Sequence, residues 1–151
     1  MNRAFGFVER ARQLANSLQW VALGVARWTL GLEFISTGWG KVHHLDRVTA
    51  YFGELGIPAP GANAVLASFT ELICGTLLFV GLGSRLAACP LIVTMVVAIV
   101  TAKRDELHGV TDLVGLVEWS YIAILGVIVL LGPGGASLDA VLARVRRQSN
   151  T

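Results

Sequence analysis

The chain has 151 residues, of which 54% are hydrophobic and only 15% are charged, whereas an ordinary soluble domain has about 25% charged residues. This composition excludes an ordinary soluble globular protein. The 12 Lys and Arg residues are nearly balanced by 10 Asp and Glu residues, which argues against nucleic acid as a partner, because nucleic-acid-binding proteins present a dense basic face.

The N-terminal segment, residues 1–19, contains no apolar run long enough to cross a bilayer. Apolar residues recur there at helical spacing with arginines between them: Phe5, Val8, Ala11, Leu14 and Leu18, with Arg3, Arg10 and Arg12. This pattern predicts an amphipathic helix that lies on the membrane surface. The segment lacks the apolar stretch and small-residue cleavage site of a signal peptide, so we expect it to be retained.

Four long apolar runs follow, and each is long enough to cross a bilayer as a helix. They cover residues 20–38, 64–82, 86–102 and 113–132. These runs lack the alternation of apolar and polar residues that marks the strands of a membrane barrel. The sequence therefore predicts an all-α protein, an integral membrane four-helix bundle in residues 20–139, with the interfacial helix before it and a basic tail, residues 140–151, after it.

The connections between the runs carry the residues that end helices. Residues 40–63 form the longest connection, and its prolines and glycines, residues 56–61, end regular structure before the second span. The turn at residues 81–84 is short, so the second and third spans should be antiparallel neighbours. Gly132-Pro133-Gly134-Gly135 ends the fourth span.

The basic residues outside the spans are distributed unequally between the two sides of the bundle. One side carries Arg3, Arg10, Arg12, Arg85, Arg144, Arg146 and Arg147, and the other carries Lys41, Arg47, Lys103 and Arg104. By the positive-inside rule, both termini of this multi-pass protein are expected in the cytoplasm.

Four ionisable residues lie inside the predicted spans, where a charged group costs about 2.5 to 3.5 kcal/mol. They are Arg27, Glu33, Glu71 and Glu118. Counted from the outer end of each span, Glu33 and Glu118 lie about 7 to 8 Å deep, and Glu71 about 10 Å deep. Three carboxylates from three helices therefore converge at one level. Arg27, about 16 Å deep, is the expected counter-ion.

These residues define a candidate ligand-binding site in the outer half of the bundle. Lys41 continues a polar row on the first span that could serve as an access route, and Tyr121 adjoins Glu118. The candidate ligand-binding residues are Arg27, Glu33, Lys41, Glu71, Glu118 and Tyr121. A structural interpretation remains open, because buried Arg and Glu pairs can simply tie helices together. The third carboxylate favours function, and no catalytic residue is assigned.

The histidines and cysteines give weaker signals. His43 and His44 in the first outer connection and His108 in the second could contribute to a metal site, but their spacing is unspecific and headgroup-level residues are the preferred interpretation. Cys74 and Cys89 are predicted to be free thiols, because they differ in depth by about 7 Å and a disulfide needs Cα atoms within about 7 Å in total.

Three motifs in order resemble the DoxX family of small bacterial membrane proteins. The first comprises Arg27, Gly31, Phe34, Gly38 and Lys41. The second comprises Glu71, Gly75, Leu78, residues 81–85, Ala87 and Ala88. The third comprises Glu118, Tyr121, residues 132–134 and residues 137–139. The resemblance covers roughly residues 21–139, and Arg27, Lys41, Glu71 and Glu118 are its matched polar positions, whereas Glu33 departs from the family pattern.

The resemblance implies a four-span protein of the bacterial inner membrane, linked to quinone-coupled redox chemistry such as thiosulfate oxidation or to a membrane oxidoreductase complex. We therefore expect a quinone or a small ligand at the carboxylate site, no intrinsic cofactor, and other membrane or redox proteins as partners beside the lipid bilayer. The alternative is a non-catalytic subunit that packs against a larger complex through small-residue stripes such as Gly24, Gly31 and Gly38. A carrier for a small lipophilic or anionic solute has little support, because the four predicted spans include no broken pair.

Overall fold

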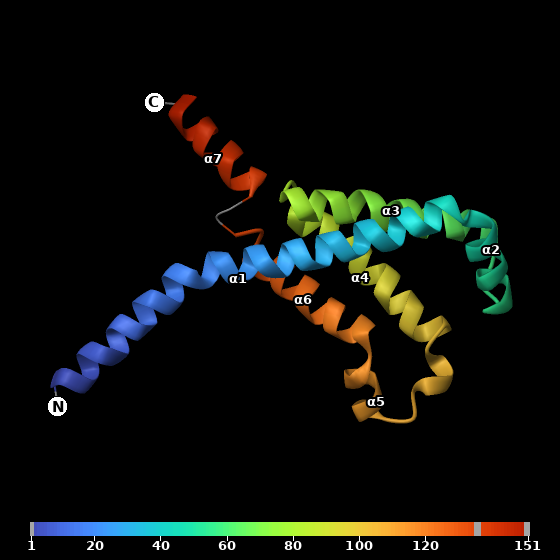
Figure 1. Ribbon diagram of the computed structural model, residues 1–151, viewed down its shortest axis with the longest axis horizontal. Helices are drawn as coiled ribbons and strands as arrows, with labels where there is room; N and C mark the ends of the chain where they lie inside the picture. The colour runs from blue at the N-terminus through green and yellow to red at the C-terminus, as the bar shows by residue number, and fades with distance from the viewer. Residues whose placement is uncertain (1, 135–136, 150–151) are drawn as a thin grey trace.

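The computed structural model describes residues 2–134 and 137–149, and every regular element in these ranges is a helix. The helices are α1 (Asn2–His43), α2 (Leu45–Glu54), α3 (Pro60–Val80), α4 (Ser84–Thr101), the 3-10 helix η1 (Arg104–Glu106), α5 (Val110–Gly115), α6 (Val117–Leu131) and α7 (Leu138–Ser149). The prediction of an all-α chain is confirmed. The first part of α1 and α7 project from one end, here called the terminal end, and α2 lies at the other, the α2 end (Figure 1).

Helix α1 is a single helix of 42 residues. The predicted boundary between an interfacial helix, residues 1–19, and the first span coincides with no break in this helix. Its first part nevertheless extends away from the other helices (Figure 1). The side chains of residues 1–17 lie outside the described part of the chain, so the amphipathic surface helix stays a prediction.

Glycines let α1 and α3 pack with their backbones in contact. A Cβ atom added at Gly38 would lie 2.5 Å from the backbone nitrogen of Leu72, and one at Gly31 would lie 2.8 Å from the Cα of Phe79. Gly75 of α3 lies equally close to α1. Membrane helices commonly associate through small residues in this way, because close approach strengthens dispersion contacts that lipid does not replace. These glycines fix the α1–α3 pair that carries the site.

The predicted glycine stripe of the first span is therefore used mostly within the chain itself. Gly31 and Gly38 face α3, whereas nothing lies within 4 Å of a Cβ atom added at Gly24. The buried apolar core joins α1 and α3 to α4 and α6 through Leu30, Phe34, Leu78, Ala88, Leu91, Met95, Leu125 and Ile128. Two of the three glycines offered as a docking stripe for a larger complex are thus already covered.

The helices at the four predicted spans differ in whether they are long enough to cross a membrane. Within the described residues, two helices, α3 and α4, are long and apolar enough to cross a membrane by length and composition. Helix α6 has 15 residues, about 22 Å of helix, which is shorter than the hydrocarbon core of about 30 Å. A bundle of four spans is accordingly an expectation that rests on α1 and α6 as well as on these two helices.

The prediction of an unbroken fourth span, residues 113–132, is wrong. Leu116 adopts extended backbone angles, φ −72° and ψ 139°, and separates α5 from α6. Gly115 precedes this break, and glycine weakens a helix because it loses more backbone entropy on folding than other residues. A carrier was disfavoured because no pair of broken spans was predicted, and this single break does not provide such a pair.

Helix α2 lies within the stretch that was predicted to be a long connection, residues 40–63. It packs against α3 and ends before Gly56, which has a positive φ of 70°. The predicted end of regular structure near the prolines is confirmed, because helix α3 begins at Pro60. Proline is favoured in the first turn of a helix, where its missing N–H would have no helical partner. The stretch predicted as a connection therefore contains a helix, α2, that packs on α3.

Candidate functional site

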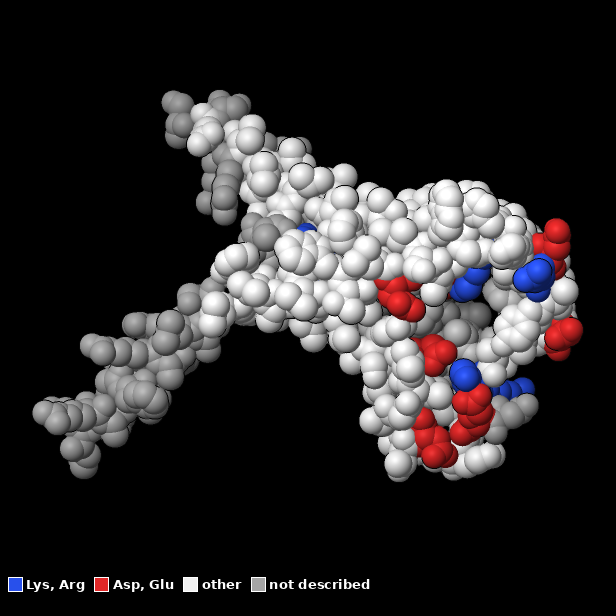
Figure 2. All heavy atoms as spheres, in the orientation of Figure 1, with Lys and Arg blue, Asp and Glu red and all other residues white. Residues whose placement is uncertain are grey.

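A large cavity lies toward the α2 end of the bundle, with a volume of about 1040 Å³. Its walls come from α1, α2, α3, α4 and α6, and a hollow bordered by acidic and basic side chains is visible on this side of the molecule (Figure 2). Five of the six candidate residues line it: Glu33, Lys41, Glu71, Glu118 and Tyr121. The three glutamates that were predicted to share one level therefore border one space.

An ion pair between α1 and α3 lies in the wall of the cavity. Lys41 Nζ donates a hydrogen bond to Glu71 Oε1 at 2.6 Å. The Glu71 side chain is 3% exposed and the Lys41 side chain 35% exposed, so the carboxylate is buried while the ammonium group stays partly accessible. The close approach at Gly38, one turn before Lys41, brings the two side chains together. Lys41 is thus the cationic partner of the buried carboxylate.

The second oxygen of the Glu71 carboxylate accepts no hydrogen bond from the described residues. Within the described part of the chain, Glu71 Oε2 is buried and has no hydrogen-bond partner. A buried acceptor without a donor costs about 1 to 3 kcal/mol, and such groups in native structures call for an explanation such as a water or a ligand. Glu71 can therefore accept one further hydrogen bond from a molecule in the cavity.

The other two carboxylates of the site lie within electrostatic range of Tyr121. Glu118 is half-buried in the first turn of α6, and Glu33 is exposed at the rim. Tyr121 packs edge to face on Phe34, with ring centroids 5.8 Å apart. The packing holds the phenol ring between α1 and α6, where its hydroxyl can donate or accept a hydrogen bond.

A second lysine reaches the cavity from the connection after α4. Lys103 Nζ donates a hydrogen bond to Glu106 Oε1 at 2.9 Å. This hydrogen bond, the charge of Glu106 and the more distant charge of Glu118 raise the pKa of Lys103 above its ordinary value. Because the pKa of a lysine side chain is ordinarily about 10.4, Lys103 stays positively charged at neutral pH.

Most of the remaining wall is apolar. Helix α2 contributes Val48, Tyr51 and Phe52, and α4 contributes Val93 and Val97. Small-molecule sites are commonly apolar clefts of about 300 to 1,000 Å³ with a few placed polar groups. The cavity has this character, with polar groups gathered around Glu71 and Tyr121 and an apolar remainder suited to a ring or a hydrocarbon tail.

Arg27 lies at the terminal end of the bundle and does not belong to this cavity. A Cβ atom added at Gly81 would overlap the Arg27 guanidinium, and Ser137 adjoins the same point. Arg27 is 1% exposed and lies within electrostatic range of Asp139. Gly81 is ten residues along α3 from Glu71, about 15 Å. The expectation that Arg27 is the counter-ion of the glutamates is therefore corrected, because its side chain extends to the turn between α3 and α4.

Replacing Gly81 with alanine is expected to destabilise the protein by more than about 1 kcal/mol, because Gly81 has a positive φ and its Cα faces the Arg27 guanidinium. Gly83→Ala is the matched control, since Gly83 also has a positive φ but open space around it. Thermal unfolding of the purified protein in detergent measures both. Equal losses for the two variants would mean that the contact with Arg27 contributes nothing beyond backbone strain.

The histidines and cysteines do not line the cavity. In the described residues, no group of three or more His, Cys, Asp or Glu side chains is close enough to hold a metal ion. The His43 ring packs against Trp39 at a tilt of 44°, with the ring centroids 4.3 Å apart, and its Nδ1 lies 2.9 Å from the Trp39 carbonyl oxygen. All three histidines are exposed. Both cysteines are free thiols, as predicted.

Several cavity residues were absent from the sequence-based site. The cavity is also lined by four residues of α2 and by one residue after α4: Arg47, Val48, Tyr51, Phe52 and Lys103. Leu45, Val48, Phe52 and Leu55 recur at helical spacing, and this periodicity would have predicted α2 as an amphipathic helix over the site. Nothing comparable in the sequence indicates that Lys103 reaches the cavity.

Known proteins similar to this chain include one family and three named bacterial proteins. The DoxX family matches residues 22–104. A Mycobacterium tuberculosis protein named "Uncharacterized membrane protein Rv3486" is 38% identical over 78% of this chain and 79% of its own length. The Escherichia coli protein named "Inner membrane protein YphA" is 32% identical over 79% of this chain and 89% of its own length. A Bacillus subtilis protein named "Putative oxidoreductase CatD" is 28% identical over 80% and 86%. No solved structure matches the chain.

Proposed function

The chain belongs to the DoxX family of membrane proteins, and we propose that its cavity binds a quinone or a related lipophilic ring compound as part of a redox system of the inner membrane. The observation that carries the proposal is the convergence of Lys41, Glu71, Glu118 and Tyr121 on one largely apolar cavity. The printed names of two relatives, "Inner membrane protein YphA" and "Putative oxidoreductase CatD", support the setting.

The polar groups of the cavity complement both forms of such a ligand. The Lys41 ammonium and the Tyr121 hydroxyl are donors that suit the carbonyl oxygens of a quinone. The carboxylates of Glu71 and Glu118 are acceptors that suit the hydroxyl groups of a quinol. Glu71 Oε2, which has no partner among the described residues, supplies one of these acceptors. The apolar wall from α2 and α4 accommodates the ring and the hydrocarbon tail.

The proposed role of this chain in the redox step is limited to binding and proton transfer. Reduction of a quinone to a quinol takes up two electrons and two protons. We assign the proton transfer to Glu33 or Lys41, with Glu33 exposed at the rim of the cavity. A general acid or base must come within about 2.6 to 3.2 Å of the reacting oxygen, or reach it through one water. The electrons come from a partner protein, so the chain acts as a subunit or an accessory protein.

Binding of a short-chain quinone to the purified protein in detergent tests the proposal, with tryptophan fluorescence as the signal. Glu71→Gln and Glu118→Gln are each expected to weaken binding about tenfold or more, because a hydrogen bond to a charged group contributes about 1.5 to 3 kcal/mol. Glu54→Gln is the matched control, since Glu54 is an exposed residue of α2 that does not line the cavity.

The alternative of a non-catalytic subunit predicts a different result in the same titration. No saturable binding, or binding that Glu71→Gln and Glu118→Gln leave unchanged, would exclude the quinone site and favour a purely structural role. The structural role would then rest on Gly24, the glycine of the predicted stripe that has open space around it.

A further inference from the structure

The C-terminal segment, predicted as a basic tail in residues 140–151, contains a helix. Helix α7 covers Leu138–Ser149 and starts at the terminal end of the bundle, on the side from which the first part of α1 also emerges (Figure 1). Among the described residues, α7 has no extended packing against another helix. An isolated helix of 12 residues is marginal in water, so α7 requires something else to pack against.

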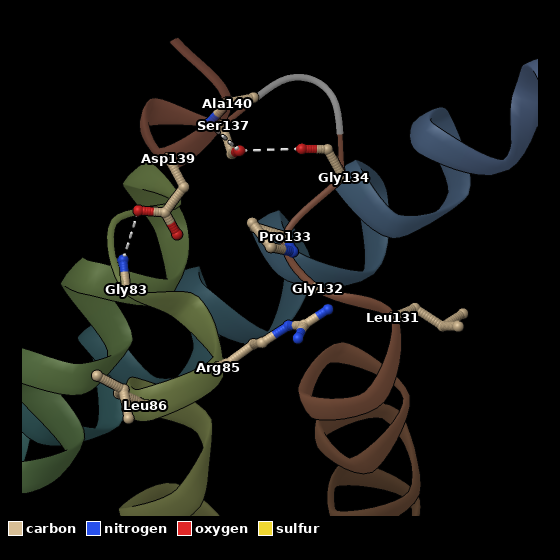
Figure 3. Close-up of a pocket in the computed structure, with 10 residues that line it drawn as sticks. All are labelled: Gly83, Arg85, Leu86, Leu131, Gly132, Pro133, Gly134, Ser137, Asp139 and Ala140. Carbon is tan, nitrogen blue, oxygen red and sulfur yellow. Dashed lines mark hydrogen bonds between the residues drawn. The ribbon is translucent and has the colours of Figure 1, made fainter. Parts of the chain in front are cut away.

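The start of α7 is attached firmly to the turn between α3 and α4 (Figure 3). The Asp139 backbone N–H donates a hydrogen bond to the Gly81 carbonyl at 3.1 Å, and Asp139 Oδ1 accepts one from the Gly83 backbone N–H at 3.0 Å. Ser137 caps the helix start, because its Oγ accepts a hydrogen bond from the Ala140 N–H and donates one to the Gly134 carbonyl. These bonds hold the first turn of α7 level with the ends of two helices that can cross a membrane.

One face of α7 is apolar and uncovered. Leu138, Val141, Leu142 and Val145 recur at helical spacing and are all exposed. Next to the attachment point, Leu86 of α4 and Leu131 of α6 are exposed as well (Figure 3). Leu86 lies on α4, which is long and apolar enough to cross a membrane, so it is positioned to contact lipid. The apolar face of α7 therefore begins where a lipid-facing surface ends.

The charge on α7 complements a lipid surface of negative charge. In helical register, positions 144 and 146 flank the apolar face and position 147 lies opposite it, and all three are arginines. Arg85, an exposed residue of α4, lies at the same end of the bundle. A helix with an apolar face and arginines on its polar face is typical of a segment that lies in the membrane interface.

We propose that α7 lies in the headgroup region of the bilayer that the chain occupies, with its apolar face toward the acyl chains and its arginines on anionic phospholipids. The hydrogen bonds of Asp139 and Ser137 hold the helix at the right level. An anionic headgroup attracts each nearby arginine with a free energy that corresponds to about fivefold in binding. This role is independent of the quinone site, because it uses the opposite end of the bundle.

A fluorophore placed on either face of α7 in the full chain tests the proposal. In a Cys74→Ala/Cys89→Ala background, Val145→Cys puts the label on the apolar face and Ala143→Cys puts it on the opposite face. The chain is reconstituted into phosphatidylcholine vesicles with or without phosphatidylglycerol. We expect the label at position 145 to be quenched by spin-labelled lipid and shielded from iodide, and the label at position 143 to show the reverse.

A charge variant provides the second measurement. Arg144→Gln/Arg146→Gln/Arg147→Gln should lower the binding of α7 to the phosphatidylglycerol surface by about fivefold per arginine. It should therefore remove most of the additional quenching that phosphatidylglycerol produces at position 145. Three results would overturn the proposal. Exposure of position 145 to iodide would place α7 in water, and equal quenching at both positions would exclude an interfacial orientation. Shielding of position 145 from both quenchers would indicate that a protein, rather than lipid, covers the face.

Discussion

Replacement of Gly38 with alanine is expected to force α1 away from α3 and to destabilise the protein by about 1 to 3 kcal/mol, the range for overpacked sites. The added Cβ atom would lie 2.5 Å from the Leu72 backbone nitrogen and 2.9 Å from its Cα. Backbone atoms of a packed helix cannot turn aside as a flexible side chain can, so the two helices must separate. The midpoint of thermal or denaturant unfolding in detergent measures the loss.

Gly40→Ala is the matched control for this variant. Gly40 lies half a turn further along α1, is exposed, and has no atom within 4 Å of an added Cβ. Alanine is a better helix former than glycine by up to about 1 kcal/mol, so this substitution should leave stability unchanged or raise it. If Gly38→Ala were as stable as Gly40→Ala, α1 and α3 would not be in backbone contact. Gly38→Ala should also weaken ligand binding, because Gly38 sets the position of Lys41.

Replacement of Lys41 with methionine is expected to have the second large effect. The variant leaves the Glu71 carboxylate, 3% exposed, without its cationic partner. Breaking a fully buried ion pair costs about 3 to 5 kcal/mol. The Lys41 side chain is 35% exposed, and water therefore screens the pair, so we expect a loss of about 2 kcal/mol in the free energy of unfolding.

The double variant Lys41→Met/Glu71→Met separates the two roles of the pair. Replacing both members of a buried pair by apolar residues is often neutral or stabilising, so the double variant should recover most of the stability that Lys41→Met loses. It should still fail to bind the quinone, because both polar groups are gone. Recovered binding together with recovered stability would mean that the pair only joins helices. A Lys41→Met variant of unchanged stability would exclude a stabilising pair.

The sequence predicts most of the helices but not their ends. Long apolar runs indicate the cores of α1, α3, α4 and α6, because the length needed to cross a bilayer is a strong constraint. The break at Leu116 is invisible, since Leu116 is one apolar residue in an apolar run and only Gly115 beside it weakens the helix. Helix α2 was not predicted, because the prolines that follow it indicate a connection, and the helical periodicity of the residues before them is short.

The candidate site was predictable in its carboxylates and in Lys41, but the partner of the carboxylates was not. Counting residues along each span brings Glu33, Glu71 and Glu118 to one level, and all three line one cavity. The same counting put Arg27 near them, because depth alone does not say in which direction a long side chain extends. Arg27 reaches Gly81, whereas Lys41 reaches Glu71. The close approach of α1 and α3 decides these pairings, and it depends on which glycines face each other.

The break before α6 also determines which backbone amides water in the cavity can reach. A helix start leaves its first backbone N–H groups without carbonyl partners inside the helix, and Leu116 provides no side-chain cap for α6. Val117 and Glu118 border the cavity, so water in the cavity can supply acceptors to these amides. Hydrogen exchange at residues 117–119 should consequently be fast while the following turns of α6 exchange slowly, which makes these three amides a probe of how far solvent penetrates the bundle.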